Sequence, residues 1–276
     1  MRMQLSQHAA ALLGQSALGI ITERVDDVAF LLGQMVTRGL PEILDRHLPR
    51  HGTQRGLSWG WTAVMWLASI VTEGDPRNGS METSRKGMHH TLRRLTAQAI
   101  APLDLRDDRL RHLLKHVSKP TYWHQSERDL HARSIAMYDV SQAMIRCDAT
   151  TVSGDHAVTE AGLFQFGQRN DAPTRPQIKV MLGALAPLGM PLATAVWSGE
   201  RADDGLDLPI IKRLRLGWHK TGLLLVGDGK MRALETRASL AKHPDRDLSP
   251  WPVTGATAEA MEAWITAGVT KDPTGE

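Results

Sequence analysis

Two aspartates are the residues of this chain whose types and positions best suit chemistry. Asp148 lies in MIRCDATTV and Asp228 lies in LLLVGDGK, each where a short apolar run meets a polar turn that contains Thr or Gly. That pattern is typical of a strand end, which delivers a carboxylate to an open edge of a sheet. Mg²⁺ prefers oxygen ligands and binds one or two protein carboxylates together with substrate phosphates. The pair therefore suits a site that cuts phosphodiesters better than a zinc or thiol site.

A purely structural role competes with this interpretation at both positions. Aspartate is common at strand ends because its side chain accepts hydrogen bonds from nearby backbone N–H groups. From spacing alone, a turn residue is favoured over a metal ligand at Asp148 and at Asp228. The segments around the two residues change that balance.

Several segments surround the two aspartates in a fixed order: GLFQFGQRND, RPQIKVMLGAL, MPLATAVWSGERADDGLDLPII and GLLLVGDGKMRALETRA. Together they resemble the catalytic core of a DDE-type insertion-sequence transposase of the insertion-sequence-four-like group, in the branch with an extra helical N-terminal domain. The stretch GLPEILDRHLPRHGTQRGLSWGWTAVMWLASIVTEGDPR, followed by HTLRRL and LDLRDDRL, resembles that extra domain. The resemblance runs from about Val25 to about Trp264.

The resemblance implies an RNase H-like core in which Asp148 and Asp228 are the first two acids of a metal-binding triad. It implies Mg²⁺ (or Mn²⁺) as cofactor, hydrolysis at a transposon end, and transfer of the freed 3′-OH to target DNA at the same metals. The implied partner is double-stranded DNA, both transposon ends and target, bound by a homo-oligomer. No membrane partner is expected.

The third acid of the family, a Glu on a downstream helix that also carries Tyr and Arg, does not occur before Glu276. Glu259 and Glu262 lie in a helix-compatible run, TAEAMEAWI, but they follow the second aspartate too soon and lack the family's surrounding residues. Asp204 is a weaker third candidate. We therefore expect a C-terminally truncated chain that is inactive, or nearly so, alone.

Two other functions stay open beside the transposase. One is a non-catalytic DNA-binding remnant that interferes with a full-length transposase by occupying DNA ends or forming mixed oligomers. The other is an unrelated RNase H-like nuclease that completes its site with Asp155 or Asp204. Whether the chain by itself is an enzyme is accordingly left undecided.

The elements that must position the aspartates follow from hydrophobic periodicity. Residues 25–140 have helical spacing, for example in VDDVAFLLGQMVTRG, in LPEILDRHL and from Trp59 to Val71. From Met144 onward MIRCDATTV, QIKVMLGALAP and MPLATAVW predict a three-strand meander, ADDGLDLPIIKRLRLGW a crossover helix, and GLLLVGD a fourth strand. If that strand returns parallel to the first, Asp148 and Asp228 become neighbours.

The predicted fold class is α+β, with three parts. Residues 1–24 are a leader that we expect to be poorly ordered, 25–140 an all-helical domain, and 141–276 a partial RNase H-like mixed β-sheet core with flanking helices. The most apolar stretch, Trp59 to Val71, is too short to cross a bilayer, and a cytoplasmic location is expected. The single cysteine, Cys147, excludes an internal disulfide and reads as a small buried side chain.

Charge adds a weaker signal for DNA. The net charge is +3, and residues 1–140 hold 18 Lys and Arg against 14 Asp and Glu. Arg93 and Arg94 are our candidates for DNA contacts in this basic part, and Arg201 and Lys230 are candidates beside the aspartates. The alternative is that these residues belong to ordinary solvated surfaces.

Overall fold

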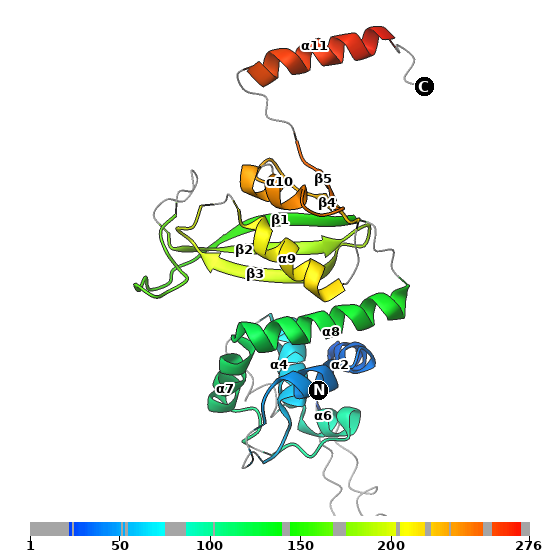
Figure 1. Ribbon diagram of the computed structural model, residues 1–276. Coiled ribbons are helices and arrows are strands. Elements are labelled where there is room, and N and C mark those ends of the chain that lie inside the picture. The colour runs from blue at the N-terminus through cyan, green and yellow to red at the C-terminus, as the bar shows by residue number, and fades with distance from the viewer. Residues whose placement is uncertain are drawn as a thin grey trace, which may run out of the picture. The chain divides into compact units, whose positions relative to one another are not determined.

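The computed structural model describes residues 22–23, 25–50, 52, 55–74, 87–101, 103–139, 144–167, 175–202, 205–218, 222–231, 233–250 and 256–271 (Figure 1). The chain divides into two compact units, Met1–Tyr122 and Trp123–Glu276. Almost all of the expected leader, 1–24, lies outside the described residues. None of the described helices is long and apolar enough to cross a membrane.

The first unit is helical. It contains α2 (Val28–Thr37), α3 (Leu40–His47), α4 (Trp59–Glu73), α6 (His89–Thr96) and α7 (Asp107–Val117). Ser58 begins α4 by accepting a hydrogen bond from the backbone N–H of Trp61 at 3.3 Å, as expected of an N-cap serine. Trp59 and Trp66 are buried in the core of this unit and Trp61 packs against it. These tryptophans are therefore core residues, not a surface for stacking bases.

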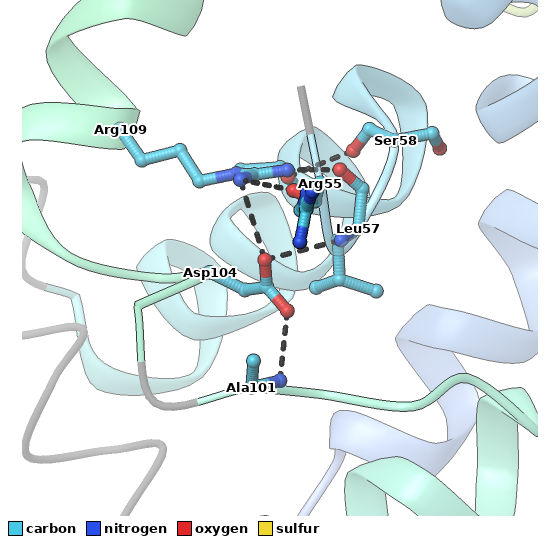
Figure 2. A network of polar contacts seen from close by, with 7 residues as sticks. Arg55, Leu57, Ser58, Ala101, Asp104 and Arg109 are labelled. Atoms are coloured by element: carbon cyan, nitrogen blue, oxygen red, sulfur yellow. Dashed lines mark hydrogen bonds and ion pairs between the residues drawn. The ribbon is translucent and has the colours of Figure 1, made fainter. Parts of the chain in front are cut away.

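A buried polar network joins the segment before α4 to the start of α7 (Figure 2). The carboxylate of Asp104 accepts hydrogen bonds from the backbone N–H groups of Leu57, at 3.1 Å, and Ala101, at 2.7 Å. Arg109 pairs with Asp104 at 3.3 Å and donates to the carbonyl oxygens of Arg55 and Leu57. Burial lowers the pKa of Arg109, although the nearby Asp104 opposes this. Because backbone groups take up these donors and acceptors, the network is structural.

The second unit contains a five-stranded mixed sheet. Its elements are β1 (Met144–Ser153), β2 (Gln177–Leu185), β3 (Met190–Ser198), α9 (Asp207–Trp218), β4 (Leu224–Val226), α10 (Leu234–Leu240), β5 (Arg246–Leu248) and α11 (Ala256–Lys271), and α8 (Pro120–Tyr138) precedes them. The strand order is β3-β2-β1-β4-β5. β1, β2 and β3 form an antiparallel meander, β4 lies parallel to β1, and β5 lies parallel to β4.

This topology confirms the predicted order of meander, crossover helix and parallel fourth strand, and with it the α+β class with an RNase H-like mixed sheet. β5 was not predicted, because the sequence around RDL has neither the length nor the alternation of a strand. α11 contains the helix-compatible run that carries Glu259 and Glu262, and both side chains are exposed.

One face of the sheet is packed against α9, which crosses in front of the strands in Figure 1. Ile145 and Cys147 of β1 join Ile210 and Leu214 of α9 in the core of this unit. Alternate residues of β1 are exposed, and Asp148 is one of them. The alternation of β1 thus buries Cys147, as predicted, and turns Asp148 to the opposite side.

The free edge of β3 is covered by side chains from helices. Glu127 of α8 accepts hydrogen bonds from the backbone N–H and the hydroxyl of Thr194, at 2.9 and 2.8 Å, and pairs with Arg213 of α9. Arg213 also donates to the carbonyl oxygen of Thr194 at 2.7 Å, and His131 hydrogen-bonds to the backbone of Leu192. Capping the unpaired backbone groups in this way protects an edge strand from pairing with another chain.

Candidate active site on β1 and after β4

Asp148 and Asp228 occupy equivalent positions relative to the parallel pairing of β1 with β4. The last paired residues of β1 and β4 are Arg146 and Val226, and each aspartate follows its member of that pair by two residues. Residues in register on parallel strands lie side by side, and residues two apart share a face. Both aspartates are exposed. Asp228 lies just beyond the end of β4, as predicted, but Asp148 lies in the middle of β1 and not at its end, because β1 continues in pairing with β2 as far as Ser153.

A tight turn after β4 holds Asp228. The backbone N–H of Lys230 donates to Asp228 Oδ1 at 2.9 Å, and the N–H of Met231 donates to the Asp228 carbonyl at 3.2 Å. Met231 is fully buried beneath this turn. Gly227 allows the close approach, since a Cβ atom there would lie 2.7 Å from the Met231 sulfur. Asp228 thus fills the structural role that competes with metal binding, and its side chain is nevertheless accessible to solvent.

A third acid, Asp207, lies in the first turn of α9 and was not predicted. Its side chain is only 5% exposed. Burial and the charge of Asp228 raise its pKa to about 6, with a smaller contribution from Asp148, while Lys230 opposes the shift. Its carboxyl group is therefore close enough to both predicted acids to sense their charges. Aspartate is common at a helix start, so the segment LDLPII did not indicate a functional acid. The only available signal was that Leu residues flank Asp207.

Lys230 and Arg201, the predicted phosphate contacts, differ in their surroundings. The charge of Lys230 lowers the pKa of Asp207, so the ammonium group of Lys230 lies near that carboxyl group. Arg201 is exposed in the segment between β3 and α9, and its guanidinium carbon lies 4.0 Å from the centre of the Trp197 ring. Nζ of Lys179 donates a hydrogen bond to the Arg201 carbonyl oxygen.

Arg93 and Arg94 lie on α6 in the first unit. Leu92 and Thr96 are buried on the inner face of that helix, and both arginines are exposed. Their side chains are therefore available to a ligand in solution, as a DNA-contact role requires.

The donor set on β1 and in the turn after β4 suits a hard cation. Asp148 and Asp228 offer carboxylate oxygens, which Mg²⁺ and Mn²⁺ prefer. The sulfur nearest in sequence is that of Cys147. Burial raises the pKa of its thiol to about 12, and the charge of Asp207 adds to this shift. The thiol is therefore neither a good metal ligand nor a reactive group. Among the described residues, no group of three or more His, Cys, Asp or Glu side chains is arranged to hold a metal ion.

Two other acids, Asp204 and Asp155, were considered from the sequence as members of this site. Asp204 lies outside the described residues. Asp155 is a surface acid, 85% exposed, that pairs with Arg175 at 3.7 Å.

A separate pocket lies among α8, β3 and α9, and it contains none of the three aspartates. Its lining residues are His124, Gln125, Glu127, Arg128, His131, Leu192, Ala193, Arg213, Leu214 and Leu216. Glu127, His131 and Arg213 already bond to the edge of β3. We therefore assign this pocket to the packing of α8 and not to the acidic site.

Comparison with known proteins gives only distant structural likenesses. No family model matches the chain. No curated protein matches its sequence. The piggyBac transposase, solved as a synaptic complex with hairpin DNA, aligns with 84% of this chain and 51% of its own, at 10% identity and a TM-score of 0.35. The chain thus spans about half the length of that transposase.

Two structures of Mos1 transposase are also similar. The paired-end complex with the left transposon end aligns with 87% of this chain and 75% of its own, at 8% identity and a TM-score of 0.28. The strand transfer complex aligns with 84% of this chain and 79% of its own, at 10% identity and a TM-score of 0.26. At such identities and TM-scores no residue role passes from these enzymes to this chain.

Proposed function

We propose that this chain is a transposase polypeptide of the DDE type, from the insertion-sequence-four-like group, and that its second unit holds the site for metal-dependent DNA strand cleavage and transfer. The observation that supports the proposal is the shared position of Asp148 and Asp228, each two residues beyond the last pair of two adjacent parallel strands. Residues 80 apart in the chain then supply carboxylates to one place.

Each residue of this site has a distinct proposed role. Asp148 and Asp228 hold the divalent cation, Mg²⁺ or Mn²⁺. When bound, a pair of such ions would supply the chemistry, one activating the attacking oxygen and one stabilising the leaving 3′ oxygen of the DNA strand. Lys230 contacts a DNA phosphate, which an ammonium group binds as a point charge. Asp207 adds negative charge beside the two ligands and so increases the attraction for a cation.

The double-stranded DNA partner is proposed to contact both units. Arg93 and Arg94 project from α6 into solvent and would neutralise phosphates at a transposon end. Binding of two ends implies a homo-oligomer on DNA. With only two exposed aspartates at the described site, we expect this chain alone to cut DNA slowly or not at all.

The test is a divalent-cation titration followed by thermal unfolding and by nicking of supercoiled plasmid. Mg²⁺ should raise the melting temperature of the wild-type chain, because a ligand that binds only the folded state stabilises it. Asp148→Ala should abolish this rise, and Asp155→Ala, which changes an exposed acid elsewhere, should retain it. An equal rise in wild type and Asp148→Ala would refute the site.

A non-catalytic DNA-binding function is the second candidate. It is favoured by the exposed Arg93 and Arg94 of α6, which can contact phosphates without any metal. It predicts tight binding to duplex DNA that is insensitive to Mg²⁺ and no nicking by wild type. Mg²⁺-dependent nicking that Asp148→Ala abolishes would exclude it.

A further inference from the structure

The position of Asp228 depends on β4, which is a very short strand. β4 has only three residues, Leu224–Val226, and Asp228 follows it by two. A slip of one residue would turn Leu225 out of the core, where it is buried, and would move Asp228 with it. β1, by contrast, pairs with β2 along most of its length, so a long ladder already holds Asp148. The placing of Asp228 relative to Asp148 therefore depends on the contacts that fix β4.

The carboxylate of Asp245 connects the beginning of β4 to α9. Its Oδ1 atom accepts hydrogen bonds from the backbone N–H groups of Gly222, at 3.1 Å, and Leu223, at 3.0 Å. Its Oδ2 atom accepts a hydrogen bond from Nε of Arg215 on α9, at 2.8 Å. The side chain of Asp245 is 2% exposed and that of Arg215 is 16% exposed. Asp245 thus uses both carboxylate oxygens, largely shielded from water, to hold the start of the strand against the helix.

β5 continues this hold along the rest of β4 (Figure 1). The backbone N–H of Arg246 donates to the carbonyl oxygen of Leu223 at 2.8 Å, and the two strands pair in parallel from there. At the other end, the N–H of Gly227 donates to the carbonyl oxygen of Leu248 at 3.1 Å. Gly227 immediately precedes Asp228. The contacts that begin at the buried carboxylate therefore reach the residue next to the proposed metal ligand.

We propose that Asp245 and Arg215 are positioning residues that fix the register of β4 and so place Asp228 for cation binding with Asp148. The inference rests on the proposed function and deepens it. Asp245 acts only through the backbone of β4 and contacts neither the cation nor the DNA. Groups that orient metal ligands contribute about ten- to one-hundredfold to metal affinity. A purely structural ion pair would instead lower the stability of the fold and leave the cation affinity of the folded chain unchanged.

The experiment measures binding of Mn²⁺ to the full chain by isothermal titration calorimetry, at a temperature at which circular dichroism shows each variant to be fully folded. Asp245→Asn should weaken Mn²⁺ binding about tenfold. Glu127→Gln is the matched control, because it also removes the carboxylate from an ion pair with an arginine of α9, but beside β3. It should destabilise the chain and leave the Mn²⁺ affinity unchanged. An affinity of Asp245→Asn equal to that of Glu127→Gln would overturn the inference.

Substitution of Arg215 separates positioning from simple electrostatics. Removing the negative charge of Asp245 would by itself weaken cation binding, whereas removing the positive charge of Arg215 would by itself strengthen it. Positioning predicts weaker Mn²⁺ binding by Arg215→Met as well, and tighter or unchanged binding by that variant would refute the positioning role. Arg215→Lys keeps the charge and one donor, so its affinity should lie between those of wild type and Arg215→Met. If the other variants do not fold, Arg215→Lys decides, and an affinity equal to that of wild type would overturn the inference.

The proposed function would fail in a different way. If Asp148→Ala and Asp228→Ala bind Mn²⁺ as tightly as wild type, the cation does not bind at the proposed site and the proposed function is refuted. If those two variants lose binding while Asp245→Asn and Arg215→Met retain it, only the positioning inference is overturned.

Discussion

The ionisation of Asp207 should give the second unit a pH-dependent stability that a single substitution removes. In the folded chain the pKa of this carboxyl is raised from 3.8 to about 6 by burial and by the charge of Asp228. A raised carboxyl pKa means that the folded state holds the proton more tightly than the unfolded state. The contribution of the group is therefore fully favourable below pH 3.8 and is lost as the pH rises through about 6.

The magnitude follows from the size of the shift. A difference of about two pKa units corresponds to about 3 kcal/mol, by which ionised Asp207 destabilises the fold at pH 7. Asp207→Asn removes the charge at nearly constant shape. It also loses a favourable interaction of about 0.5–1 kcal/mol between an acid and the start of α9. The variant should therefore be more stable than wild type at pH 7 by about 2 kcal/mol, or about 4–8 °C in melting temperature.

Thermal unfolding of both proteins between pH 4 and pH 8, with divalent cations chelated, tests this reasoning. The advantage of Asp207→Asn should be absent near pH 4 and should grow up to about pH 7. Asp155→Asn is the matched control, because Asp155 is exposed and lies in a surface ion pair. A stability difference that is constant over the pH range, or a variant less stable than wild type at pH 7, would contradict the proposed burial of charge.

Three further outcomes are expected. Glu127→Gln leaves the partly buried Arg213 without its ion-pair partner and should destabilise the chain by about 3 kcal/mol in urea unfolding. A loss below about 1 kcal/mol would contradict this assignment. Changing Arg93 and Arg94 together to Ala should lower the magnitude of the salt slope for duplex DNA by about 1.8, and an unchanged slope would remove α6 from the interface. Asp228→Ala should abolish the rise in melting temperature caused by Mg²⁺, and persistence of that rise would show that the cation binds elsewhere.

Local patterns in the sequence were sufficient to predict the elements. The period-two alternation of MIRCDATTV predicts β1 and its buried Cys147, and the strand has both. Short or irregular pieces escaped prediction. β5 has three residues, Arg246–Leu248, and is recognisable only by its pairing with β4.

The composition of the site depended on the tertiary structure. Asp148 and Asp228 are adjacent only because β4 pairs in parallel with β1, and this register depends on how the intervening helix packs. Asp207 looks like any acid at a helix start until α9 buries it beside two other carboxylates. The stacking of Arg201 on Trp197 likewise depends on the path of the segment after β3.

The physical reason for this division is the range of the interactions. Helix and strand preferences arise from neighbouring residues and from alternation along the chain, so the sequence by itself determined the order of the elements around the two acids. Desolvation, charge coupling and stacking depend on groups that are distant in sequence, such as Glu127 and Arg213, which are 86 residues apart. Only the packed fold decides which of those groups meet, and therefore which carboxylates and cations can act together.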